Sequence, residues 1–160
     1  CLTPRVEVFK DEVWYTNLYD LPATVTTKDK NGTIELIADV KLKNVDRKEV
    51  QGTASAFDIG YNCTADKTEI SVTTKQVIKE PTAFVLPIIS PSSEVVTKIS
   101  DKEITIQKPE GLVTIKANTP IKTKEISGKR TFNMVPGVEA LPLEVFFVDN
   151  NELKISILIS

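Results

Sequence analysis

The sequence predicts an all-β protein, an antiparallel β-sandwich with little or no helix. Its 160 residues include 16 Ile, 17 Val and 18 Thr but only 8 Ala and 11 Leu. β-Branched residues suit a pleated sheet, whereas a helical domain would favour Ala and Leu. Apolar and polar residues alternate in several segments, and turn residues separate these segments at intervals of roughly ten residues, as in sandwiches and barrels.

The clearest local prediction is a β-hairpin around the dipeptide Asn31-Gly32. Apolar side chains occupy every second position of the segment that follows, namely Ile34, Leu36, Ala38, Val40 and Leu42. This alternation places them on one face of a strand. Asn-Gly accepts the positive φ angles of a tight turn, so residues 21–28 are expected to form the partner strand.

Further strands follow along the chain. We expect them within residues 68–79, 82–89, 102–107, 112–117, 141–145 and 153–159. The apolar run 82–89 suits a strand buried on both faces. Pro87 lacks an N–H group, which predicts an edge position or a bulge there. Turns are expected at residues 109–111 and 149–152, and residues 45–51 are interpreted as a loop rather than a short helix.

The chain is expected to form a single β-sandwich domain over residues 1–160. A subdivision near residues 90–93 is the alternative, because Pro91, Ser92 and Ser93 form a turn-like break after a strand. Either half would be too small to bury a core of its own easily. One shared sandwich is therefore the preferred interpretation.

Composition excludes several classes of function. The chain has no His and two Cys, so it holds no catalytic pair that needs His and no His-ligated or four-Cys zinc site. A net charge of -2 argues against nucleic acid as a partner. No apolar run reaches the length of a membrane span. Acidic pairs such as Asp101 with Glu103 are interpreted as solvated surface groups. We expect no catalytic residue, metal or cofactor in this chain.

Three aromatic residues stand close together near the start of the chain. Trp14, Tyr15 and Tyr19 are the candidate ligand-binding residues, because exposed aromatic faces can stack on sugar rings. Alternation predicts that Tyr15 and Trp14 lie on opposite faces of a strand. The competing interpretation is that these rings fill the core or an interface with a neighbouring domain.

Cys1 is a candidate site of lipid attachment. A first-position Cys is what a processed bacterial lipoprotein carries, although the strand-like residues 6–9 follow almost at once, where a flexible tether would be usual. A cut point that happens to precede a Cys is the alternative, and a bridge between Cys1 and Cys63 is left open. These features predict a periplasmic or extracellular location, with outer-membrane anchoring through Cys1 as one form of it.

Several segments resemble the β region of heparinase II/III-like polysaccharide lyases. They are residues 84–91 (FVLPIISP), 104–109 (ITIQKP), 111–115 (GLVTI), 130–137 (RTFNMVPG) and 139–143 (EALPL). The resemblance implies the C-terminal β-sandwich region of a modular enzyme. Such lyases carry an α/α toroid, and they cleave acidic polysaccharides by removing a proton beside a uronic acid carboxyl group.

The resemblance implies a non-catalytic module, because no catalytic position of that family matches a residue of this chain. We expect a structural or accessory role in binding acidic polysaccharide, with the catalytic domain of a longer parent chain as a partner. The alternative function is a lipid-anchored bacterial surface β-sandwich protein that binds a glycan or a protein.

Overall fold

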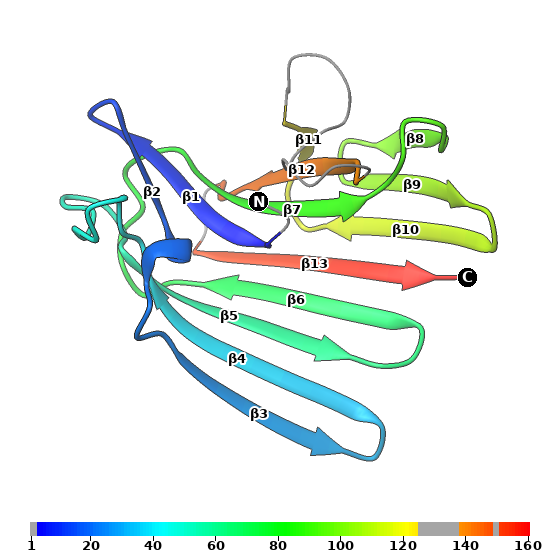
Figure 1. Ribbon diagram of the computed structural model, residues 1–160, viewed down its shortest axis with the longest axis horizontal. Helices are drawn as coiled ribbons and strands as arrows, with labels where there is room; N and C mark the ends of the chain where they lie inside the picture. The colour runs from blue at the N-terminus through cyan, green and yellow to red at the C-terminus, as the bar shows by residue number, and fades with distance from the viewer. Residues whose placement is uncertain (1–2, 125–137, 149–150) are drawn as a thin grey trace.

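The computed structural model describes residues 3–124, 138–148 and 151–160 (Figure 1). This part of the chain forms thirteen strands in two antiparallel sheets and one short 3-10 turn, η1 (Asn17–Tyr19). The all-β sandwich is therefore confirmed. No helix within the described ranges is long and apolar enough to cross a membrane.

The smaller sheet has five strands in the order β11-β12-β7-β1-β2. These strands are β1 (Arg5–Lys10), β2 (Val13–Thr16), β7 (Thr82–Ile89), β11 (Ile121–Thr123) and β12 (Ala140–Phe146). The run 82–89 is buried on both faces from Thr82 to Pro87, as its continuous apolar sequence predicts.

The larger sheet has eight strands in the order β3-β4-β5-β6-β13-β10-β9-β8. These strands are β3 (Thr24–Lys30), β4 (Thr33–Lys41), β5 (Ala56–Cys63), β6 (Lys67–Thr73), β8 (Val96–Ser100), β9 (Glu103–Lys108), β10 (Gly111–Ala117) and β13 (Glu152–Ile159). The C-terminal strand β13 lies in the interior of this sheet, between β6 and β10 (Figure 1).

One apolar cluster lies between the two sheets and draws on both. Phe84 and Leu143 enter it from the smaller sheet, while Val72 and Leu153 enter it from the larger one, and all four are fully buried. The alternation in residues 102–107, 141–145 and 153–159 places apolar side chains in this cluster. Residues 91–93 lie in the connection from β7 to β8, where the chain passes from the smaller sheet to the larger one.

The smaller sheet covers only part of the larger one. Every residue of β3 is exposed. In β4, Val40 is buried in the core whereas Ile34 is 48% exposed. Figure 1 shows β3 and β4 on the side of the larger sheet that extends away from β1, β7 and β12. The expected apolar face of residues 34–42 is therefore buried only at its C-terminal end.

The predicted hairpin is present, with β3 paired to β4. Its turn residues Asn31 and Gly32 have φ angles of 51° and 82°, which is the left-handed region that this dipeptide tolerates. Residues 45–51 form a loop with one isolated bridge between Lys43 and Glu49, as expected. The turn expected at residues 149–152 includes residues 149 and 150, which lie outside the described ranges.

The prediction for Pro87 is only partly right. β7 lies inside the smaller sheet rather than at its edge, but its pairing with β1 ends at Val85. On the other side Pro87 lies opposite Pro142. The Pro142 carbonyl accepts from the Lys124 N–H at 2.9 Å, so its backbone polar groups face away from β7. Pro87 and Pro142 therefore lie opposite each other where the backbone groups of Pro142 are turned away from β7. The two prolines remove no hydrogen bond between β7 and β12.

Truncation of Leu143 tests the shared core. Leu143→Ala should lower the free energy of unfolding by about 2–5 kcal/mol, because the lost side chain leaves a cavity between the sheets. The matched control is Leu21→Ala, since Leu21 is 69% exposed and should change stability by no more than about 0.5 kcal/mol. Chemical denaturation measures both variants, and equal effects would contradict the proposed core.

Candidate functional site

The first candidate surface is an aromatic patch on the β1–β2 hairpin and the η1 turn that follows it, defined by Phe9, Trp14 and Tyr19. Phe9 and Trp14 are cross-strand partners, and their ring centroids lie 4.9 Å apart. Trp14 is 52% exposed. The ammonium group of Lys124 lies 4.9 Å from the centre of the Trp14 ring, which is within the range of a cation–π contact.

The three predicted aromatic residues do not form one site. Trp14 and Tyr19 line the same shallow surface pocket of about 430 Å³, together with Leu18 and Val45. Tyr15 instead packs against the hydrophobic core. The predicted separation of Trp14 from Tyr15 across the strand is therefore observed, and only Trp14 and Tyr19 present their rings at this surface.

An ion-pair network fixes the position of Lys124, which contacts the Trp14 ring of the aromatic patch. Glu7 accepts hydrogen bonds from Arg5 and, at 2.7 Å, from the Nζ of Lys124. Lys124 also lies 3.5 Å from Glu144 on β12. Because these groups are largely buried and come from two strands, β1 and β12, they hold Lys124 in place over Trp14.

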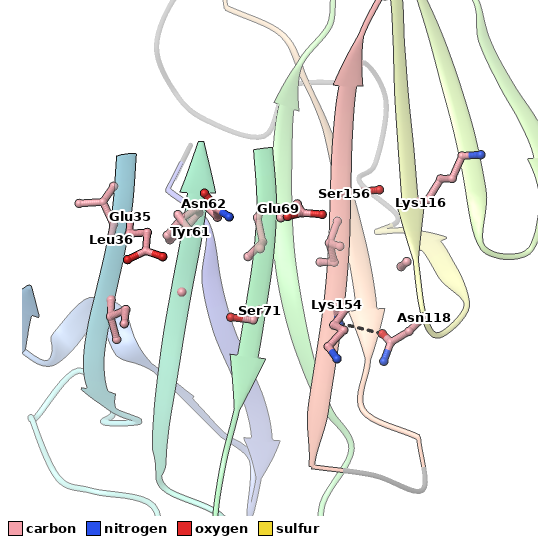
Figure 2. A pocket seen from close by; sticks show the side chains of 15 residues that line it. Glu35, Leu36, Tyr61, Asn62, Glu69, Ser71, Lys116, Asn118, Lys154 and Ser156 are labelled. Carbon is pink, nitrogen blue, oxygen red and sulfur yellow. Dashed lines mark hydrogen bonds between the residues drawn. The ribbon is translucent and has the colours of Figure 1, made fainter. Parts of the chain in front are cut away.

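A larger groove crosses the outer face of the eight-stranded sheet and has a volume of about 550 Å³. We call it the sheet groove. Its residues belong to β4, β5, β6, β13 and β10 and the residue after β10 (Figure 2). Core residues Ile70 and Ile155 alternate with polar lining residues on their strands, so the groove lies on the face turned away from the smaller sheet.

Strand register arranges the groove in two rows of side chains. The first row runs across the sheet as Glu35, Asn62, Glu69, Ser156 and Lys116. The second row runs beside it as Ile37, Gly60, Ser71, Lys154 and Asn118. Between them, a row of inward-facing residues contributes the floor: Leu36, Tyr61, Ile70, Ile155 and Ala117.

Gly60 widens the sheet groove at the centre of the second row. A Cβ atom at this position would lie 2.6 Å from the Ser71 Oγ, which is too close without a shift of Ser71. Gly in a strand interior costs stability, and one common reason for it is the close approach of another group to the backbone. The sequence thus keeps the centre of the second row free of a side chain.

Hydrogen bonds order the β13–β10 end of the groove. The backbone N–H of Lys154 donates to Asn118 Oδ1 at 2.9 Å, and Asn118 Nδ2 donates to the Glu152 carbonyl at 3.1 Å. The two lysines of this end form exposed ion pairs, Lys116 with Glu103 and Lys154 with Glu152, both at 3.2 Å. Such pairs are weak, so the lysines can exchange these partners for an anionic ligand.

Tyr61 contributes its backbone to the groove floor, while its side chain packs against the core on the opposite face of the sheet. Burial, followed by the nearby Cys63, raises the pKa of the Tyr61 phenol from 10.0 to about 12. The phenol is therefore neutral at physiological pH and is a poor candidate for a general base.

The described residues hold no group of three or more His, Cys, Asp or Glu side chains that could bind a metal ion. Cys63 lies half-buried on β5, and its Sγ accepts from Thr68 Oγ1 at 3.8 Å. Cys1 lies outside the described ranges, so lipid attachment there stays a prediction.

Sequence reasoning did not find the sheet groove. Its residues come from five strands whose neighbours in the sheet are not all neighbours in the chain. The sequence signal for the groove was Gly60. Phe57, Ile59 and Tyr61 alternate along one face of a strand, and Gly60 leaves a gap among the side chains of the opposite face.

Comparison with known proteins identifies the domain. The profile of the family described as ulvan lyase C-terminal domain matches residues 1–160. The chain belongs to this family. A broad-specificity ulvan lyase from Formosa agariphila is 58% identical over 146 residues. The match covers 91% of this chain but 23% of the relative, so the chain corresponds to less than a quarter of that protein. A polysaccharide-lyase C-terminal region is thereby confirmed.

Replacement of Tyr61 tests the burial of its phenol on the core side of the larger sheet. The unfolded phenol ionises near pH 10 and the folded one near pH 12, so the contribution of this group to stability is lost as pH rises through that window. The loss should amount to roughly 2–3 kcal/mol. Denaturation of wild type and Tyr61→Phe below pH 10 and near pH 12 measures it, and parallel curves for the two proteins would contradict the assignment.

Replacement of Trp14 tests whether the aromatic patch is surface or core. Trp14→Ala should lower the free energy of unfolding by about 1 kcal/mol, since the ring loses mainly its contacts with Phe9 and Lys124. Trp14→Phe, which keeps a ring, should lie closer to wild type. A loss of about 3–5 kcal/mol, as for a buried Trp, would show that the ring belongs to the core.

Proposed function

We propose that this chain is the non-catalytic C-terminal β module of a polysaccharide lyase, with a structural or accessory role in binding acidic polysaccharide. The observation that carries the proposal is the match of the whole chain to the ulvan lyase C-terminal domain family. The relative from Formosa agariphila is named for action on ulvan, so ulvan is the polysaccharide we propose for the parent of this chain.

The chemistry of the chain supports a catalytic centre elsewhere in the parent. A lyase needs a base that accepts a proton near neutral pH, and the chain contains no His. Tyr61, whose side chain packs against the core beneath the sheet groove, keeps its proton until about pH 12. The relative extends well beyond the matched segment, which leaves ample sequence for a catalytic domain.

We further propose that the parent is organised like a heparinase II/III-like lyase, with a toroid that packs on this module. Of the segments that carry the resemblance, residues 130–137 lie outside the described ranges, and the others coincide with strands. Residues 84–91 include most of β7, residues 104–115 span the β9–β10 hairpin, and residues 139–143 enter β12. These are core-forming elements, so the resemblance concerns the scaffold of the module.

A periplasmic or extracellular location fits this role, because a polymeric substrate is met outside the cytoplasm. Lipid anchoring through Cys1 remains the alternative proposal. The reading frame upstream of Cys1 distinguishes the two: several hundred residues with helical periodicity support a parent lyase, and a short signal sequence supports a lipoprotein.

Trp14 and Tyr19 are proposed as a second contact for polysaccharide or for the rest of the parent protein. Both rings are exposed and line one pocket. Tyr15 is left out of this proposal, because its ring packs against the core.

The proposed function predicts binding without turnover. In affinity electrophoresis, the isolated 160-residue chain should migrate more slowly through gels that contain ulvan than through gels without polysaccharide. Its mobility in gels that contain a neutral glucan should equal its mobility in gels without polysaccharide. Incubation with ulvan should produce no unsaturated sugar, measured by ultraviolet absorbance, because the chain lacks a base for the elimination.

Two results would contradict this proposal. Equal mobility with and without ulvan would remove the binding role, and release of unsaturated sugar by the isolated chain would show that the module is itself a catalyst.

A further inference from the structure

We propose that the sheet groove is the polysaccharide-binding site of the module and that it holds a stretch of acidic oligosaccharide lying across strands β4 to β10. This inference rests on the proposed function and specifies its site. It assigns the main contact to Lys116, Lys154 and the polar residues between them and β4, rather than to the aromatic patch.

The dimensions of the sheet groove suit an oligosaccharide. Adjacent strands of a sheet lie about 4.8 Å apart, so the four intervals from β4 to β10 span about 19 Å. The volume of about 550 Å³ lies within the usual range of ligand pockets. The groove continues across the strands, which favours an extended chain over a single small molecule.

The walls of the groove carry the hydrogen-bonding groups that sugar hydroxyls need. Glu35 and Glu69 offer oxygen acceptors at the β4–β6 side, while Ser71 and Ser156 offer hydroxyl groups in the middle. Hydroxyl groups of a sugar both donate and accept, so they can pair with every one of these side chains. Figure 2 shows these polar side chains along the successive strands.

Charge divides the groove into two ends. Lys116 and Lys154 stand at the β13–β10 end, whereas Glu35 and Glu69 stand at the β4–β6 side. The lysine side chains are 51% and 66% exposed, which leaves their ammonium groups within reach of a ligand. A carboxylate or sulfate on the polysaccharide would meet the two lysines, and an uncharged sugar would meet the acidic side. This layout fits a polymer whose anionic groups are spaced by neutral hydroxyl-rich stretches.

The frame of the groove is rigid, which lowers the entropic cost of binding. Strands β5, β6 and β13 are each paired on both sides, and their opposite faces are anchored in the core by residues such as Val72 and Leu153. Asn118 is tied to β13 by three hydrogen bonds. The groove is therefore formed before a ligand arrives.

The experiment compares charge-removing variants of the 160-residue chain by isothermal titration with ulvan fragments. The groove variant is Lys116→Gln/Lys154→Gln. Its matched control is Lys98→Gln, since Lys98 is 59% exposed, also forms an ion pair and lies on the same sheet at β8. Trp14→Ala reports on the aromatic patch. All of these side chains are at least half exposed, so the lysine variants should melt close to wild type and Trp14→Ala only slightly below it.

The proposal predicts that the groove variant binds ulvan fragments at least about tenfold more weakly than wild type, whereas Lys98→Gln and Trp14→Ala bind within about threefold. Carboxyl-reduced ulvan and dextran sulfate distinguish the two possible anions. Weaker wild-type binding to reduced ulvan assigns the lysines to a carboxylate. If wild type binds reduced ulvan as tightly as native ulvan, and if binding to dextran sulfate is lost in the groove variant, the two lysines bind a sulfate.

Retained affinity in the groove variant would overturn the groove assignment. If Trp14→Ala then abolished binding, the module would still be a polysaccharide-binding domain, but its site would be the aromatic patch. Absence of wild-type binding to any ulvan fragment would overturn both the groove assignment and the proposed binding function.

Discussion

The apolar layer between two sheets of unequal width is the constraint on which the rest of the structure depends. Each strand that faces this layer must direct every second side chain into it, and a slip of one residue would expose the whole apolar set. Val72 and Leu153, on neighbouring strands, are both fully buried there. The register between β6 and β13 is therefore determined by burial as well as by hydrogen bonds.

The same constraint creates the outer surface of the larger sheet. Because Ile70 and Ile155 face the core, the residues that flank each of them along its strand must face outward. Strand register brings these outward residues from β4 to β10 into two rows. Gly60 leaves the middle of one row open. The sheet groove thus follows from core packing and from the polar residues at the outward positions. The aromatic patch, in contrast, depends on the separate β1–β2 hairpin.

Local patterns were sufficient to predict the elements whose signal lies within a short segment. The Asn31-Gly32 hairpin and strands β7, β9, β10, β12 and β13 all follow from alternation, apolar runs and turn residues. Strand β5 was not recognised, since Asp58 and Gly60 weaken its pattern, and the exposed edge strand β8 has little apolar alternation. The environment of Pro87 depends on where β1 ends, which no local pattern specifies.

The sheet groove was beyond local sequence reasoning because it requires the strand order. β13 inserts between β6 and β10, so Ser156 lies beside Glu69 although the two are far apart in the chain. The aromatic patch, in contrast, comes from one short segment, and two of its three exposed rings, Trp14 and Tyr19, were predicted together. Tyr15 shares that segment but packs on the core, because successive residues of a strand face opposite sides.

The most direct test of a polysaccharide site on the larger sheet is a titration of the isotope-labelled chain with ulvan fragments, followed by backbone amide NMR shifts. The largest shifts of amide signals should fall on outward residues of β4, β5, β6, β13 and β10, including Gly60. Changes confined to the β1–β2 hairpin around Trp14, or no changes at saturating ligand, would contradict a site on the larger sheet.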